Sequence, residues 1–368
     1  MGVLRESAAA ERRVALPPGL VGKVRALGLA VAVERGAGER AWFSDSAYRE
    51  AGAAVLTAEE VIDSCDTLLC VGPPAVSRLR PGRLLIGLLD PLRNTDLVAV
   101  CAARGVTAVS LDLLPRTLSR AQPMDALTSQ AAIAGYKAAV LAADTYGGYF
   151  PMLVTAAGTV RPATVLVLGT GVAGLAAIGT ARRIGAIVTG YDIRPEAADE
   201  VRSLGAHFLD LGPAPHGGGT GGYARALSAG ERAAQQDALQ ERVVGFDIII
   251  TTARVPGRTP PLLVTAEAVK GMRPGSVVID LAAGADGGNV EGSVPDTSLI
   301  VGDGVTVIGA GNLPSAMAPA ATAAYGRNIL AVLTHLMQDG APVIDRSDEI
   351  QAAIVVHGAA TTDREITA

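Results

Sequence analysis

Short apolar runs, many of them β-branched, alternate along the chain with longer stretches of mixed polarity. In the first third the apolar runs lie at 29–33, 67–71, 84–89 and 106–110, and the stretches at 17–27, 46–52, 58–64 and 95–104 are typical of helices. Strands that alternate with helices indicate a parallel sheet covered by those helices. We therefore expect a small doubly wound α/β domain here, to which the late apolar run 352–356 adds an edge strand.

The same alternation resumes after residue 160. Apolar runs at 165–168, 186–191, 206–209, 247–253, 276–282 and 305–312 alternate with helical stretches at 195–204, 229–242 and 265–270, and two longer helical stretches lie at 131–147 and 315–338. We predict two Rossmann-like doubly wound parallel-sheet domains, joined by the long helices and with a cleft between them. The first is discontinuous and comprises 1–128 plus 326–368, and the second comprises 129–325.

Residues 165–192 carry the most specific motif of the chain, VLVLGTGVAGLAAIGTARRIGAIVTGYD. An apolar strand runs into Gly169, Gly171 and Gly174, a helix and a second strand follow, and Asp192 stands at the tip of that strand. This context distinguishes a dinucleotide fingerprint from a chance GxGxxG. Gly169 permits the sharp turn, Gly171 lets a pyrophosphate approach the backbone, and Gly174 lets helix and strand pack closely.

The pyrophosphate would lie on the free N–H groups at the start of the helix. Asp192 would accept hydrogen bonds from the adenosine ribose, which favours NAD(H) over a nucleotide with a 2′-phosphate. Arg194 could accommodate such a phosphate, but we interpret it as an exposed loop arginine. The alternative to the whole motif is a glycine-rich turn without a ligand. The residues expected to contact the nucleotide are Gly169, Gly171, Val172, Ala173, Gly174, Asp192, Ile193, Arg194, Thr252 and Ala253.

Two further segments are candidates for function. Residues 112–130, DLLPRTLSRAQPMDALTSQ, concentrate hydrogen-bonding side chains ahead of a long helix, and such loops often line binding clefts. A solvated connector with helix-capping residues explains that spacing equally well. Residues 212–222, GPAPHGGGTGG, precede Tyr223 and suit either a lid or an insertion between strand and helix.

Composition narrows the class of protein. The net charge of −5 is spread along the chain without a basic run, which argues against nucleic-acid binding. Charge, glycine or proline interrupts every apolar run before it could span a bilayer, and no signal-peptide pattern begins the chain. The three cysteines lack metal or disulfide spacing, which favours reduced thiols in the cytoplasm, and the four histidines are too scattered for a metal site.

Taken together, the motifs resemble the NAD(H)-binding component of proton-translocating nicotinamide nucleotide transhydrogenases. The most specific segments are 119–138, 155–175, 251–257 and 275–289. The resemblance implies a first domain of the formate/glycerate dehydrogenase type and a homodimer at the cytoplasmic face of the membrane. It also implies a membrane-spanning subunit and an NADP(H)-binding beta subunit as partners. Hydride then passes directly from NADH to NADP⁺ on the beta subunit, coupled to proton movement.

The resemblance also implies site residues. In the family an arginine, a glutamine and an aspartate hold the nicotinamide end, and Gln122 and Asp125 match the last two, with Ser129 beside them. The arginine is Arg116, with Arg120 in reserve, because one extra residue separates arginine from glutamine in this chain. Tyr223 corresponds to a mobile loop that closes on the nucleotide. Hydride transfer between two rings needs positioning and exclusion of water rather than an acid or base.

Two other functions compete with this interpretation. Alanine dehydrogenases share the fold, but they need a substrate-binding lysine where this chain has 70–74 (CVGPP) and a catalytic histidine where it has Asp90. Arg13 matches an arginine common to both families, so it does not discriminate between them. A protein that binds NAD without chemistry is the third possibility, although the Gln122 and Asp125 segment would then have no use.

Overall fold

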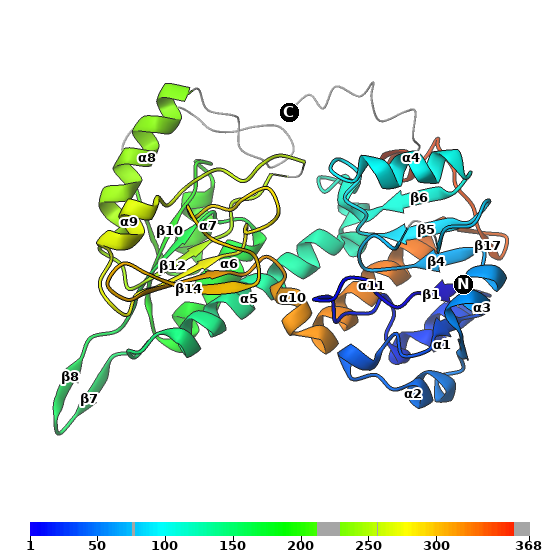
Figure 1. The fold of residues 1–368 in the computed structure, drawn as a ribbon, viewed down its shortest axis with the longest axis horizontal. Helices are drawn as coiled ribbons and strands as arrows, with labels where there is room; N and C mark the ends of the chain where they lie inside the picture. Colours follow the sequence, from blue (N-terminus) through cyan, green and yellow to red (C-terminus); the bar gives the residue numbers. More distant parts are fainter. Residues whose placement is uncertain (76–77, 212–228, 256, 357–368) are drawn as a thin grey trace. The chain divides into compact units, whose positions relative to one another are not determined.

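The computed structural model describes residues 1–75, 78–211, 229–255 and 257–356, with side chains in helix α8 (Ala229–Val243) described from residue 236 (Figure 1). The chain forms two compact units. Among the described residues, one unit consists of Met1–Gln130 together with 314–356, and the other is Ala131–Leu313. The predicted pair of doubly wound α/β domains is confirmed by the strand order of both sheets.

The first unit contains a seven-stranded sheet in the order β18-β6-β5-β4-β1-β2-β3. Its strands are β1 (Gly2–Val3), β2 (Ala32–Glu34), β3 (Ala54–Leu56), β4 (Thr67–Leu69), β5 (Leu84–Gly87), β6 (Thr107–Ser110) and β18 (Val355–Val356). Its helices include α1 (Pro18–Ala26), α2 (Asp45–Glu50), α3 (Ala58–Ser64), α4 (Thr95–Ala103), α11 (Ala318–Leu336) and α12 (Glu349–Ile354). Only β18 runs antiparallel to its neighbour among these described strands.

The late edge strand is shorter than expected. Residues 352–354 close helix α12, and only Val355 and Val356 pair with β6. Asp348 explains the helix, because its carboxylate caps α12 by accepting from the N–H groups of Ile350 and Gln351. Ile350 and Ile354 are buried one turn apart in the core. The first part of the apolar run 352–356 therefore belongs to the buried face of α12, and only its end forms the strand.

Helix α11 belongs entirely to the first unit. Ala318, Tyr325 and Ile329 are buried in that unit's core, and the Tyr325 hydroxyl donates to the Cys70 carbonyl at 2.8 Å. The predicted domain boundary at 325/326 therefore falls inside a helix whose buried face is continuous. The two compact units instead divide between Leu313 and Pro314, before α11 begins.

The second unit contains a seven-stranded sheet in the order β11-β10-β9-β12-β13-β15-β14. The strands are β9 (Thr164–Leu168), β10 (Ile187–Tyr191), β11 (His207–Phe208), β12 (Ile248–Thr251), β13 (Val277–Asp280), β14 (Thr297–Val301) and β15 (Val305–Gly309). The helices are α6 (Val172–Ile184), α7 (Ala197–Ser203), α8 and α9 (Ala266–Gly271). Without the antiparallel β14, which the apolar pattern did not reveal, this order is that of dinucleotide-binding domains.

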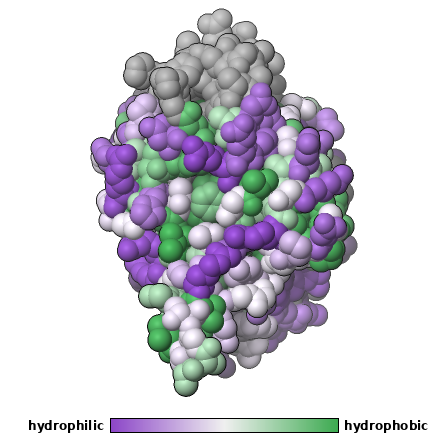
Figure 2. All heavy atoms as spheres, turned by 90° about the vertical axis from the view of Figure 1, so that its left-hand side faces the viewer, coloured by the Kyte–Doolittle hydropathy of each residue, from purple (hydrophilic) through white to green (hydrophobic). Residues whose placement is uncertain are grey.

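A two-stranded hairpin, β7 (Leu153–Thr155) and β8 (Gly158–Val160), stands away from the sheet of the second unit (Figure 1). Its side chains are largely exposed, including Val154 at 74%, and Met152 just before it is 61% exposed. Figure 2 shows hydrophobic residues on the surface of this hairpin at the lower end of the view. Just after β8, Arg161 donates two hydrogen bonds to the buried Asp247, so the base of the hairpin is tied to the sheet.

Candidate functional site

The second sheet reverses its strand order between β9 and β12, and parallel sheets bind ligands at such a switch point. Gly169 directly follows β9 and has a φ of +89°, which disfavours residues that carry a side chain. Its carbonyl oxygen accepts a hydrogen bond from the Thr252 hydroxyl at 2.8 Å, so the loops after the two strands are joined. Thr252 and Ala253 thus lie beside the fingerprint.

The start of α6 is open. Gly171 is the N-cap residue of α6, and no side chain caps the helix there. Among the described residues no atom lies within 4 Å of the point where a Gly171 side chain would begin. A Cβ at Gly174 would instead lie 2.0 Å from the Gly169 carbonyl oxygen. The uncapped N–H groups of Val172, Ala173 and Gly174 therefore offer a cradle that fits a pyrophosphate.

Helix α5 (Ala126–Thr145) passes from the first unit into the second and supports this cradle. A Cβ at Gly135 would lie 1.9 Å from the Ala173 carbonyl oxygen. Only glycine at 135 therefore lets α5 pack so closely on the first turn of α6. The glycines at 135 and 174 fix the α6 turn from two sides, one against a neighbouring helix and one against the strand end.

Asp192 follows β10 and is bonded to the fingerprint loop. Its Oδ2 accepts from the N–H of Thr170 at 2.8 Å and from the Thr170 hydroxyl at 3.2 Å. Its Oδ1 accepts from the Arg194 N–H at 3.0 Å. These hydrogen bonds hold the carboxylate in one orientation. The Asp192 side chain is 10% exposed, so only a small part of it is accessible to a ligand.

The interpretation of Arg194 as an exposed loop arginine was wrong. Its side chain is only 15% exposed, and its Nε lies 3.2 Å from Asp192 Oδ1. Its Nη2 also donates to the Thr170 carbonyl at 3.3 Å. The guanidinium folds back across the turn that includes Ile193 because the Asp192 carboxylate and the Thr170 carbonyl both lie within hydrogen-bonding distance. Arg194 therefore supports the Asp192 carboxylate directly.

Two buried polar residues that the sequence motifs did not reveal hold the Thr252 and Ala253 loop. Asn289 is completely buried, its Oδ1 accepts from the Ala253 N–H at 3.0 Å, and its Nδ2 donates to the Ala253 carbonyl at 2.9 Å. Asp280 ends β13, is also completely buried, and accepts from the Thr251 and Ser293 hydroxyls. A polar residue at the end of a buried strand was the available signal for Asp280.

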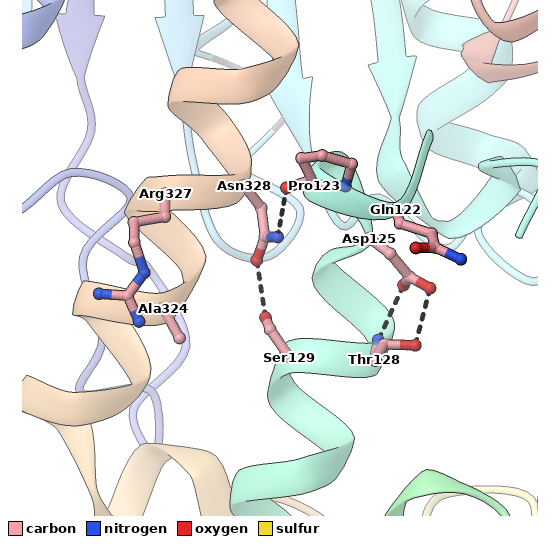
Figure 3. Close-up of a pocket in the computed structure, with 8 residues that line it drawn as sticks. All are labelled: Gln122, Pro123, Asp125, Thr128, Ser129, Ala324, Arg327 and Asn328. Carbon is pink, nitrogen blue, oxygen red and sulfur yellow. Dashed lines mark hydrogen bonds between the residues drawn. The ribbon is translucent and has the colours of Figure 1, made fainter. Parts of the chain in front are cut away.

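The first unit contains a cavity of about 380 Å³ between α11 and the segment that precedes and begins α5. It is lined by Gln122, Pro123, Asp125, Thr128, Ser129, Ala324, Arg327 and Asn328 (Figure 3). The polar segment predicted as a loop contains the 3-10 helix η4 (Ser119–Met124). Three of the four predicted nicotinamide-site residues therefore line one cavity.

The fourth, Arg116, binds the aspartate of the same group. Its Nε donates to Asp125 Oδ2 at 3.1 Å, and its Nη2 donates to the Thr128 hydroxyl at 2.9 Å. The Thr128 hydroxyl in turn donates to Asp125 at 2.7 Å. The reserve candidate Arg120 lies elsewhere, donating to Asp348 at 2.7 Å with half of its side chain exposed. Tyr223, the last predicted site residue, lies outside the described residues.

The first sheet has a switch point of its own, between β1 and β4, and a carboxylate fills it. Glu6 accepts from the N–H groups of Val71 and Gly72, at 2.6 and 3.1 Å, directly after β4. Backbone N–H groups at this place would otherwise be available to a ligand. Since Glu6 satisfies them from within the chain, the two sheets share a topology but not an open nucleotide cradle.

Burial raises the pKa of Glu6 from its ordinary 4.5 to about 7, partly opposed by the two backbone hydrogen bonds. A raised carboxyl pKa stabilises the fold below about pH 4.5, and this contribution is lost as the pH rises through about 7. Wild type should therefore lose stability relative to Glu6→Gln, by about 1–2 kcal/mol between about pH 5 and about pH 8, a value reduced because Glu6 is only partly buried. Urea unfolding of both proteins across this range measures the difference, and parallel pH profiles would contradict it.

The positions that would distinguish an alanine dehydrogenase carry other chemistry. Cys70 is buried, and the main-chain N–H of Asp90 donates to Asp112 at 2.9 Å. Arg13 is buried and donates two side-chain hydrogen bonds to Glu11 and a third to Gln130 at 2.8 Å. The chain thus lacks a lysine or histidine at either position, and its shared arginine is bonded within the unit.

Cys65, Cys70 and Cys101 are buried and free. Within the described ranges no three His, Cys, Asp or Glu side chains lie where they could hold a metal ion. No helix in those ranges combines the length and apolarity needed to cross a membrane.

The two doubly wound units and the glycine cradle at a switch point define an α/β protein of the dinucleotide-binding class. Residues 2–134 match the family described as alanine dehydrogenase/PNT, N-terminal domain, and residues 138–364 match its C-terminal domain. The chain belongs to this family, and within it to the alpha subunits of NAD(P) transhydrogenase, an oxidoreductase, which confirms the predicted resemblance.

Among the relatives, NAD(P) transhydrogenase subunit alpha of Cereibacter sphaeroides is 43% identical over 98% of this chain and 71% of its own length. Subunit alpha of Haemophilus influenzae is 40% identical over 97% of this chain and 70% of its own length. A crystal structure of transhydrogenase from Sinorhizobium meliloti has a TM-score of 0.85 at 38% identity, covering 97% of this chain and 98% of that one. Alanine dehydrogenase of Mycobacterium tuberculosis is 32% identical over 81% of this chain and 76% of its own.

Proposed function

We propose that this chain is the NAD(H)-binding subunit of a proton-translocating transhydrogenase and that it delivers hydride from NADH to NADP⁺ on a partner subunit. The observation that carries the proposal is that Gln122 and Asp125 line one cavity and that Arg116 is paired with Asp125, in a transhydrogenase-like chain. A protein that only binds adenosine has no use for this group, and imine reduction would need the catalytic histidine for which this chain has Asp90.

In this proposal the two ends of NAD(H) have different partners. The uncapped turn of α6 takes the pyrophosphate, and the Asp192 carboxylate takes the adenosine ribose. Ile193, Thr252 and Ala253 contact the same half of the nucleotide. Arg116, Gln122, Asp125 and Ser129 hold the nicotinamide end, so that hydride passes directly to the second nicotinamide. The partners are an NADP(H)-binding beta subunit and a membrane-spanning subunit, with this chain peripheral on the cytoplasmic face.

The direct test combines the purified chain with an NADP(H)-binding beta subunit and follows reduction of acetylpyridine adenine dinucleotide by NADPH. We expect transfer in the mixture and none with either component alone. Intact NADH binding without transfer would overturn the proposal. Turnover of pyruvate with ammonia by the chain alone would instead support an alanine dehydrogenase.

Asp192→Ala should weaken NADH binding by about 1–3 kcal/mol, because ribose hydrogen bonds to a carboxylate are lost. Calorimetric titration with NADH measures the change. Asp199→Ala is the matched control, since Asp199 is an exposed carboxylate on α7 whose salt bridge lies within the helix. Equal affinities for wild type and Asp192→Ala would show that Asp192 does not contact the nucleotide.

We further propose that the chain forms a homodimer through the β7–β8 hairpin. Its support is the exposed apolar surface of the hairpin, with Met152, Val154 and Val160 all more than 40% exposed. Two strands without a covering layer are marginal in water, so a second copy of the chain supplies the layer that the hairpin lacks.

Val154→Asp should raise the dimer dissociation constant by about 100-fold, because the interface would have to bury an unpaired charge. Sedimentation equilibrium measures this constant. Ile300→Asp is the matched control: Ile300 lies on β14 and is equally exposed, at 71%. A dimer that tolerates Val154→Asp, or that Ile300→Asp weakens as strongly, would contradict a hairpin interface.

A further inference from the structure

Asn328 lies on α11, only 8% exposed, and its amide group joins two parts of the candidate nicotinamide cavity. Its Oδ1 accepts from the Ser129 hydroxyl at 2.7 Å. Its Nδ2 donates to the Pro123 carbonyl at 2.8 Å, one residue beyond Gln122 (Figure 3). One amide thus connects the first turn of α5 to η4, and both of these segments carry predicted nicotinamide ligands.

A second set of hydrogen bonds, centred on Gln130, also fixes the Ser129 hydroxyl. Gln130 donates from Nε2 to the Ser129 hydroxyl at 3.2 Å and to the Ala321 carbonyl on α11 at 3.2 Å. Its Oε1 accepts from Arg13 at 2.8 Å, and Arg13 is bonded to Glu11. Glu11, Arg13 and Gln130 are all buried, so water does not compete for these bonds.

This set of hydrogen bonds leaves the Ser129 hydroxyl little freedom. The hydroxyl accepts from Gln130 and directs its single proton toward Asn328 Oδ1, with the Ala126 carbonyl as a longer alternative at 3.1 Å. A reversed Asn328 amide would place its NH₂ against the Ser129 hydroxyl and its oxygen against the Pro123 carbonyl. The Pro123 contact would then be repulsive, so the network admits one orientation of the amide.

We infer that Asn328 is a positioning residue for hydride transfer, which fixes the η4 segment with Gln122 against the first turn of α5 with Asp125 and Ser129. The inference rests on the proposed function. The donor ring must be held within a fraction of an ångström for direct transfer, and a loop on a 3-10 helix does not by itself supply that precision. Asn328 supplies it from α11, whose buried face is part of the first unit's core.

The test is Asn328→Asp in the complex with the beta subunit. Aspartate keeps the size of the side chain and an acceptor for Ser129, but it sets an oxygen against the Pro123 carbonyl. We expect the single-turnover rate of hydride transfer from saturating NADH to fall by about 10- to 100-fold. Affinity for ADP-ribose, which lacks the nicotinamide, should stay within about twofold, because the fingerprint of the second unit is unaltered.

Two controls frame this result. Asn94→Asp makes the same chemical change in the same unit, where the side chain accepts from the Leu97 N–H, and should leave both quantities at their wild-type values. Asp192→Ala should weaken ADP-ribose binding, an effect that Asn328→Asp should not share. Gln130→Glu is a second variant. Gln130 does not line the cavity, and the change removes the side-chain NH₂ that donates to the Ser129 hydroxyl. We expect it to lower the rate of hydride transfer less than Asn328→Asp does.

The outcomes separate the inference from the proposed function. Absence of transfer by the wild-type complex would defeat the proposed function itself. Transfer at the wild-type rate by Asn328→Asp would overturn the positioning role alone. Equal losses of ADP-ribose affinity and rate would also overturn it, since a general structural defect affects both. If Asn328→Asp does not fold, Gln130→Glu decides by the same two measurements.

Discussion

Asp125→Asn is expected to slow hydride transfer by about 100-fold in the reconstituted complex, with little change in affinity for ADP-ribose. The aspartate is 8% exposed and accepts from the Arg116 guanidinium, the Thr128 N–H and the Thr128 hydroxyl. Asparagine has the same shape but no charge, so Arg116 loses its counter-ion in a largely buried setting and turns away. Stopped-flow single turnovers at saturating NADH measure the rate.

Two arginine variants sharpen this prediction. Arg116→Gln should reproduce the loss, because it removes the other half of the same ion pair. Arg120→Gln should keep the rate within about twofold, since its pair with Asp348 is half exposed and lies outside the cavity lining. A larger effect from Arg120→Gln than from Arg116→Gln would reverse the assignment of the nicotinamide-site arginine.

Gly174→Ala is the second change with a large expected effect. The new methyl would lie 2.0 Å from a main-chain oxygen, that of Gly169, which cannot move without distorting the turn at the end of β9. We expect a loss of about 3 kcal/mol in the free energy of unfolding and no measurable NADH binding at ordinary concentrations. Chemical denaturation and calorimetric titration measure the two effects.

Two other glycines of the same segment serve as controls with opposite outcomes. Gly179→Ala, in the middle of α6, meets no described atom within 4 Å and should stabilise the helix by about 0.5–1 kcal/mol. Gly171→Ala meets no described atom either, so stability should be kept while NADH affinity falls, because the methyl occupies the approach of the pyrophosphate. Normal NADH binding by Gly171→Ala would place the pyrophosphate elsewhere.

The parts of the fold that could be predicted from the sequence are those that depend on residues close together in the chain. Each buried parallel strand is a short apolar run that ends in glycine or a polar residue, and the order of strands and helices then restricts the topology. The fingerprint was recognisable because strand, glycines, helix and Asp192 are contiguous. Its geometry follows from sterics alone, as the Gly174 contact shows.

What could not be predicted depends on contacts between distant residues or on where a side chain turns. Asn328 lies 199 residues from its partner Ser129, and an alanine-rich helix gives no indication of which polar position faces a cavity. Arg194 was misjudged because its exposure is decided by a charged partner two residues away. The edge strand of the tail was predicted, but its length was overestimated because the same apolar run also forms a helix face. Likewise, the sequence does not reveal that Arg116 pairs with Asp125 whereas Arg120 pairs with Asp348.

The division of the chain also orders events during its synthesis. The second unit is one continuous stretch, Ala131–Leu313, so every strand of its sheet has been synthesised before α11. The first unit has by then contributed its N-terminal strands but still lacks Tyr325 and Ile329, which close its core. Because domains fold as units once their residues are available, the first unit remains incomplete while the second folds. The strands of the first unit that precede α5 therefore remain unprotected while the second unit folds, and chaperones and proteases can bind them during that time.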